Sequence, residues 1–316
     1  MQSMRILAVA FIAISGLGAG WLASPAFAND SLVSTWTLVA VEKHPDSDGA
    51  ERARLPRGLL VLDRAGYVFE YFSAETTGVD EGLTGPARTL AETGGFWGRY
   101  AVDDAAGRIR YDSWDGVSPA VRGLSFVRGF ELDGDRLVIT STDEPQAQGE
   151  TRWTWQRVPT VEHLSPAYRE VVGFWQHVEE GQMNLETREL ANPRQRGPSV
   201  IVYTPGGFVG VHFPPVTRES FTGETPTAEE AQAALRGYIG YFGTLNVYPG
   251  EVSHNILSGI SPGTGSILRR YADIDGDELV VELQSAGGRA GSDGDRPRQP
   301  TIVRLKRLSG ADDMLP

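Results

Sequence analysis

The stretch Leu124–Val138 reads LSFVRGFELDGDRLV and has the pattern of a β-hairpin. Alternate residues of its first half share one face, which is apolar apart from one arginine: Leu124, Phe126, Arg128, Phe130 and Leu132. The Asp133-Gly134-Asp135 step that follows supplies the residues of a tight turn. We therefore expect a half-buried strand, a turn and a second strand.

A near-copy of this hairpin occurs late in the chain, at Leu268–Val281, which reads LRRYADIDGDELVV. Its Asp275–Asp277 step matches the first turn, and Arg270 stands at the same depth as Arg128. The repetition predicts that the chain is a duplication of one β-rich unit.

Other segments of the two halves also correspond. Trp36 in the first half matches Trp175 in the second, and Leu59–Phe72 matches Ser199–Phe213, with a glycine in the turn of each. The first half contains about eight short segments with strand character, at the spacing typical of an antiparallel barrel or sandwich. The expected fold class is therefore all-β.

One helix is predicted, at Pro226–Phe242 in the second half. Thr227 is a favourable N-cap, and Glu230 three residues later completes a capping box. Apolar residues recur at helical spacing along one stripe: Ala231, Ala234, Leu235, Tyr238, Ile239 and Phe242. The first half has only a shortened equivalent, around Pro86–Thr93.

The N-terminus has the pattern of a secretory signal peptide over residues 1–28. Arg5 precedes the apolar segment Ile6–Leu22, and Ala26-Phe27-Ala28 is a small-x-small cleavage site. We expect cleavage after Ala28 and a secreted or periplasmic protein; a retained N-terminal anchor is the alternative. The other expected boundaries are 29–158 for the first unit, 159–170 for a proline-containing linker and 171–309 for the second unit.

Composition excludes several classes of site and partner. The chain of 316 residues has no cysteine, which removes thiol catalysis and disulfides, and its net charge of −12 disfavours nucleic acid as a partner. Beyond the N-terminal segment, no stretch reaches the roughly 20 apolar residues that span a bilayer, so no membrane span is expected after signal removal.

No metal or cofactor is expected either. The five histidines lack metal-binding spacing, and no phosphate-binding or dinucleotide-binding loop occurs. The segment Asp273–Glu278 is similar to a calcium loop, but Gln284 stands where such a loop requires glutamate.

Taken together, these features resemble a tandem pair of bacterial lipocalin-like domains. The residues that carry the resemblance are Trp36, Gly173-Phe174-Trp175, Tyr203-Thr204-Pro205-Gly206-Gly207, Gly237–Gly243, the two Asp-Gly-Asp hairpins and the closing Trp155-Gln156-Arg157. The second half fits better, because the first has Arg64-Ala65 in place of Pro205-Gly206. The resemblance implies two tandem antiparallel barrels, the second with a covering α-helix, each around an apolar cavity, in a fold generally assigned to binding.

Arg128 and Arg270 are the first candidate ligand-binding residues. Both lie mid-strand on the apolar face, and a buried guanidinium without a partner is very costly. Two interpretations stay open: an internal hydrogen-bonded pair, or contact with an acidic or carbonyl-bearing ligand.

His254 and its equivalent in the first half, Tyr111, are the next candidates. His254 lies between Val252 and Ile256 on one strand face, so it points inward if they do. Both side chains could serve as hydrogen-bonding or acid–base groups. A histidine satisfied within the core is the alternative.

Three aromatic residues of the predicted helix, Tyr238, Tyr241 and Phe242, are expected at the cavity mouth, although packing of the helix onto the barrel explains them equally well. The direction of His212 cannot be decided from alternation.

Arg157 and Arg307, at the ends of the last strands, are expected to stack on Trp36 and Trp175 and to close the barrel floors.

The predicted function is binding of a small apolar or amphipathic molecule, with the second barrel as the binder. The alternative is a cofactor-free cyclase, isomerase or hydrolase that uses His254 as acid or base and Arg270 to stabilise negative charge. A third class is a structural module whose barrels are filled by side chains.

Overall fold

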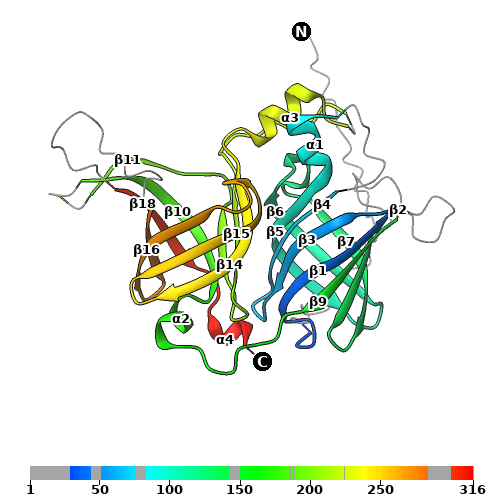
Figure 1. Ribbon diagram of the computed structural model, residues 1–316, viewed down its shortest axis with the longest axis horizontal. Coiled ribbons are helices and arrows are strands. Elements are labelled where there is room, and N and C mark those ends of the chain that lie inside the picture. The colour runs from blue at the N-terminus through cyan, green and yellow to red at the C-terminus, as the bar shows by residue number, and fades with distance from the viewer. Residues whose placement is uncertain are drawn as a thin grey trace, which may run out of the picture.

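The computed structural model describes residues 29–43, 51–75, 83–141, 150–184, 187, 189–223, 225–283 and 300–315. The expected signal peptide lies outside these residues. The described chain forms two closed antiparallel β-barrels in tandem, which confirms the predicted fold class (Figure 1).

In barrel 1 the strands follow one another in chain order, and β1 closes the sheet by pairing with β9. Its strands are β1 (Ser34–Lys43), β3 (Arg54–Leu62), β4 (Tyr67–Glu75), β5 (Thr93–Asp103), β6 (Arg108–Gly116), β7 (Ser125–Asp133), β8 (Arg136–Ser141) and β9 (Thr151–Arg157). Short β2 (Glu51–Arg52) pairs with the end of β1, helix α1 (Gly85–Glu92) precedes β5, and a 3-10 turn (Pro119–Val121) precedes β7.

Barrel 2 repeats this order and closes between β10 and β18. Its strands are β10 (Gly173–Met183), β12 (Val200–Tyr203), β13 (Phe208–Phe213), β14 (Ile239–Tyr248), β15 (Glu251–Ser261), β16 (Ile267–Asp275), β17 (Glu278–Leu283) and β18 (Thr301–Arg307). Short β11 (Leu190–Arg194) pairs with the end of β10.

Two helices lie at the end of the molecule where the C-terminus is found (Figure 1). The chain between the barrels contains α2 (Pro166–Val171), whose first turn is capped by the Ser165 hydroxyl accepting from the Tyr168 backbone N–H. After β18 the chain forms α4 (Ala311–Met314), which packs beneath both barrels.

Helix α3 (Ala228–Leu235) begins as the sequence predicted but ends seven residues before Phe242. Thr227 and Glu230 form the expected capping box. The chain then turns and enters β14 at Ile239. Figure 1 shows α3 beside α1 at one end of the molecule, so the two helices lie together over the junction of the barrels.

Each barrel is closed at one end by an arginine stacked on a tryptophan. The Arg157 guanidinium lies 4.2 Å from the Trp36 ring centre, and that of Arg307 lies 4.0 Å from the Trp175 ring centre. Each indole N–H donates to a backbone carbonyl four residues earlier. The predicted stacking is thus present in both copies, and it closes one end of each barrel.

The barrels pack against each other through the outer faces of β3–β5 and β12–β14, which share one buried apolar core. Its largest members are Phe69, Tyr71, Trp97, Phe174, Tyr238 and Phe242. These strands carry near-continuous apolar sequences because both of their faces are buried. Gly210 provides the space for Phe69, since a Cβ there would lie 2.4 Å from the Phe69 ring.

Buried polar contacts also join the barrels. Arg218 donates to Asp115 at 2.8 Å and to the Gly116 carbonyl at 2.6 Å, and both charged side chains are fully buried. His212, whose direction the sequence left open, points outward from barrel 2 and contacts the Glu70 carbonyl at 2.8 Å. Burial lowers the pKa of His212 to about 4, so this imidazole is neutral at neutral pH.

Candidate functional site

Barrel 2 encloses a cluster of polar side chains from four strands. Tyr203 ends β12, Tyr241 lies on β14, His254 on β15 and Arg270 on β16. Strand alternation turns these residues inward, because each shares its face with buried aliphatic residues of the barrel core. The cluster therefore stands in apolar surroundings.

Tyr203, His254 and Tyr241 form one hydrogen-bonded network. The Tyr241 hydroxyl lies 2.8 Å from His254 Nδ1, and the Tyr203 hydroxyl lies 3.2 Å from His254 Nε2. A neutral imidazole has one N–H donor and one acceptor nitrogen, so one tyrosine donates to it and the other accepts from it. The hydroxyl proton of the accepting tyrosine then points elsewhere, and no second partner of either hydroxyl occurs among the described residues.

The protonation states follow from burial. Desolvation, with the nearby positive charge of Arg270, lowers the pKa of His254 to about 3, so the imidazole is neutral at neutral pH. Desolvation also raises the pKa of both Tyr203 and Tyr241 well above the usual value, so both hydroxyls keep their protons. The network is thus uncharged, and Arg270 is the adjacent charge.

Arg270 lies on the inward face of β16, opposite buried Val252 on β15. Its neighbours Leu268 and Ala272 on that face are only partly buried, so solvent reaches this side of the interior. Its guanidinium donates to the backbone carbonyl of Arg269 at 3.1 Å. Within the described part of the chain it forms no ion pair with a carboxylate.

The strand registers give each of these residues an equivalent in barrel 1. Val211 on β13 occupies the position that Glu70 on β4 has in barrel 1. Val211 pairs with Ile201 and Tyr241 on its neighbouring strands, and Glu70 pairs with Leu60 and Phe96 on the corresponding strands. By the same pairing, barrel 1 has Leu62, Phe96, Tyr111 and Arg128 where barrel 2 has Tyr203, Tyr241, His254 and Arg270.

Barrel 1 satisfies its interior arginine internally. Arg128 is 4% exposed and donates to Glu70 Oε2 at 2.7 Å. Four aromatic rings surround its guanidinium at 4.5–5.5 Å: Phe96, Tyr111, Phe126 and Trp153. Of the two interpretations of Arg128, the internal pair is the one present, and Tyr111 is buried as part of this aromatic shell.

The equivalent shell of barrel 2 is smaller. Leu268 stands in place of Phe126, Val303 in place of Trp153, and Val211 in place of Glu70. Leucine and valine fill less volume than the aromatic rings of barrel 1. In barrel 2, aliphatic side chains thus replace two of the aromatic rings and the carboxylate around the arginine, and hydroxyl and imidazole groups lie near it.

One comparison with known proteins, a family model, agrees with the fold of barrel 2. Residues 172–307 match the family model described as a lipocalin-like domain. Barrel 2 is therefore similar to a lipocalin-like domain. Over 88% of this chain and 97% of the other, the chain also matches the crystal structure of a protein with unknown function from the DUF3598 family of Nostoc punctiforme, at 10% identity and a TM-score of 0.22. No curated protein matches the chain.

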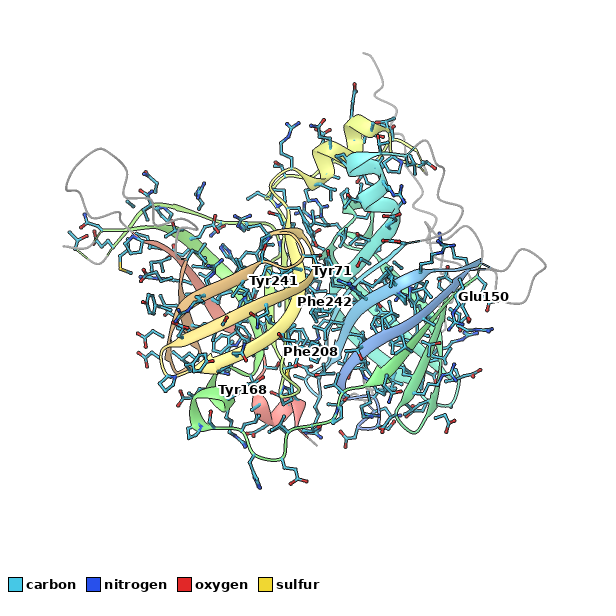
Figure 2. The ribbon with its side chains drawn as sticks, in the orientation of Figure 1. Tyr71, Glu150, Tyr168, Phe208, Tyr241 and Phe242 are labelled. Carbon is cyan, nitrogen blue, oxygen red and sulfur yellow. The ribbon has the colours of Figure 1, made fainter. Side chains whose placement is uncertain are left out.

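The structure corrects the expectation for Tyr238 and Phe242. Both lie in the core between the barrels, where the Tyr238 hydroxyl contacts His212 Nδ1 and the Phe242 ring lies 5.9 Å from that of Tyr71. Figure 2 shows Phe242 beside Tyr71, with Tyr241 on the side of barrel 2. Because β14 has begun by Ile239, neighbouring residues point to opposite faces, and only Tyr241 enters the lipocalin-like barrel.

Tyr203 is a site residue that the sequence reading missed. It was assigned only to the turn motif Tyr203–Gly207, although it alternates with Ile201 on the inward face of β12. Aligning it with Leu62 of the first copy would have shown a polar group where the other barrel has an aliphatic one.

Two surface hollows lie apart from this cluster. One of about 320 Å³ lies at the junction of the barrels, where Ser73 and Ser258 bond to each other at 2.7 Å and Arg57 donates to the Leu257 carbonyl. The other, about 730 Å³, lies on the outer face of barrel 2, where Arg269 is already paired with Glu251. Neither hollow is lined by the residues of the polar cluster, whose side chains face the interior of barrel 2.

The described residues contain no helix long and apolar enough to cross a membrane. No set of three metal-binding side chains converges in the part of the chain that the structure describes.

Proposed function

We propose that the protein binds one small amphipathic molecule inside barrel 2. The observation that carries the proposal is the convergence of Tyr203, Tyr241, His254 and Arg270 in a barrel whose core is largely apolar. The other buried charge on its inward face, Glu180, is paired with Arg196 at 2.9 Å. Ligand sites in proteins are mostly apolar and have a few convergent polar groups that orient the ligand. Barrel 1, whose interior arginine is paired with Glu70 and enclosed by aromatic rings, acts as a support that buries the outer face of barrel 2.

Binding is favoured over catalysis by the state of His254. A general base works best with a pKa near the working pH, whereas burial lowers the pKa of His254 to about 3. This imidazole is therefore a weak base at neutral pH and is suited to orienting a hydroxyl. The proposed location is outside the cytoplasm, supported by the N-terminal sequence pattern.

The proposal is tested by filling the interior of barrel 2. In Val303→Trp the tryptophan of barrel 1 is placed at the equivalent position, and Val281→Phe enlarges the residue that pairs with it. Both variants are expected to abolish fluorescence enhancement of the uncharged dye N-phenylnaphthylamine, which the wild type should show with one site. Val178→Trp, on the outer face of β10 where the valine is 47% exposed, is the matched control and should bind as the wild type does.

Native mass spectrometry of the same proteins gives the stoichiometry. One dye molecule on the wild type and none on the folded Val303→Trp or Val281→Phe variant supports the proposal. Unchanged dye binding in both variants, with intact circular dichroism spectra, contradicts it.

A further inference from the structure

The interior arginines of the two barrels, Arg128 and Arg270, differ in whether a carboxylate of the chain lies beside them. In barrel 1 the Glu70 carboxylate lies 2.7 Å from the Arg128 guanidinium, so the chain supplies its own anion. In barrel 2 the equivalent of Glu70 is Val211, which is 2% exposed and belongs to the apolar core. Barrel 2 therefore retains the arginine, Arg270, but has no carboxylate at the position of Glu70.

No described carboxylate forms an ion pair with Arg270. The buried Glu180, which pairs with inward-facing Val303 across β10 and β18, is itself paired with Arg196 at 2.9 Å. The residues of the barrel 2 core that surround Arg270 are aliphatic or uncharged: Tyr203, Val211, Tyr241, Val252, His254 and Leu268. Arg270 forms its only hydrogen bond among the described residues with the carbonyl of its neighbour Arg269. A guanidinium has five N–H donors, so most of its hydrogen-bonding capacity faces the interior or solvent there.

The position is therefore favourable for an anionic group brought by a ligand. An arginine binds a carboxylate through two parallel charge-assisted hydrogen bonds, which are stronger in apolar surroundings than in water. The hydroxyl proton that the Tyr203–His254–Tyr241 network does not use provides a further donor on the same side. The apolar residues around it suit a hydrocarbon portion.

We propose that the ligand of barrel 2 is an amphipathic carboxylate whose acidic group pairs with Arg270, in the place that Glu70 fills in barrel 1. This inference rests on the proposed function and adds the charge and polarity of the ligand. It also assigns Arg270 as the residue that makes the site prefer a negatively charged ligand over an uncharged one.

The test compares three probes that share a twelve-carbon chain and differ in their head group: dodecanoate, dodecanol and dodecyltrimethylammonium. Each is used below its micelle concentration to displace N-phenylnaphthylamine from the full chain. Dodecanoate should displace the dye at about 10- to 100-fold lower concentration than dodecanol, because a hydrogen bond to a charged group contributes about 1.5–3 kcal/mol. Dodecyltrimethylammonium should be the weakest.

Three variants locate the effect. Arg270→Gln should remove the preference for dodecanoate over dodecanol. Arg269→Gln, which alters the adjacent arginine on the outer face, should keep the wild-type preference. Val211→Glu introduces the carboxylate of barrel 1 and should abolish dodecanoate binding while the protein remains folded, since the new glutamate pairs with Arg270.

The outcomes separate the inference from the proposed function. Equal displacement by dodecanoate and dodecanol in the wild type overturns the inference and leaves binding in barrel 2 standing. A preference that survives in Arg270→Gln, or in Val211→Glu if the former does not fold, also overturns it. Failure of all three probes and of the dye to bind overturns the proposed function itself.

Discussion

Barrel 1 and barrel 2 have the same strand order and the same closed end but differ in their interiors. In barrel 1 the arginine at mid-strand is paired with Glu70 and enclosed by four aromatic rings. In barrel 2 the equivalent arginine faces two tyrosines and a histidine, and smaller side chains surround it. The difference teaches that two copies of one fold can keep the same strands and the same interior arginine while they satisfy that arginine in different ways.

The largest expected effect follows from removing the internal anion of barrel 1. Glu70→Leu leaves Arg128 buried without its carboxylate, which costs about 3–5 kcal/mol of unfolding free energy. Urea denaturation followed by tryptophan fluorescence measures the loss. The double variant Glu70→Leu with Arg128→Met should recover most of it, because an apolar replacement of a buried pair is often neutral.

A matched control is available in barrel 2. Glu251→Leu breaks the pair with Arg269, whose side chain is 65% exposed, and an exposed pair contributes at most about 1 kcal/mol. If Glu70→Leu were no more destabilising than Glu251→Leu, the internal pairing of barrel 1 would not stabilise it as described.

The second prediction concerns pH, because His254 of barrel 2 stands where barrel 1 has Tyr111. The pKa of His254 is lowered from 6.5 in the unfolded chain to about 3 in the folded barrel. Between these values the unfolded chain binds a proton that the folded chain does not, so this contribution to stability is present above pH 6.5 and is lost as the pH falls. From pH 7 to pH 4.5, the wild type should lose about 2–3 kcal/mol more than His254→Gln.

His212 also has a lowered pKa, but it is present in both the wild type and His254→Gln. Its contribution to the pH dependence of stability therefore cancels when the two proteins are compared. Identical pH profiles for the wild type and His254→Gln would refute the buried neutral state of this histidine.

The smallest effect is expected at the closed ends, where the two barrels are alike. Arg157→Gln and Arg307→Gln each remove one stacked arginine, and each should cost about 1–2 kcal/mol, the upper range for a partly desolvated cation–π contact. Thermal unfolding of the two variants should give similar losses. A loss confined to one barrel would show that the closed ends are not equivalent.

Sequence alone predicted the features that depend on local alternation. The inward direction of Arg128, Arg270 and His254, and the stacking of Arg157 and Arg307 on tryptophan, follow from a two-residue period within single strands. The duplication was visible because both hairpins keep the same turn residues.

The partners of these residues could not be predicted, because they come from distant strands. Glu70 lies 58 positions from Arg128, and no local pattern connects the two. Tyr238 and Phe242 were placed wrongly because helical spacing was extended past Leu235 into a strand. The packing between barrels was also missed, although the near-continuous apolar sequences of β4 and β13 are typical of strands buried on both faces.

The most direct test of the difference between the barrels is a crystal structure of the protein with ω-bromododecanoate, in which the anomalous signal of bromine locates the hydrocarbon chain. The account predicts a bromine peak inside barrel 2, with the carboxylate about 3 Å from the Arg270 guanidinium, and no peak inside barrel 1. A peak inside barrel 1 or in the hollow between the barrels, with the interior of barrel 2 filled by its own side chains, would contradict it.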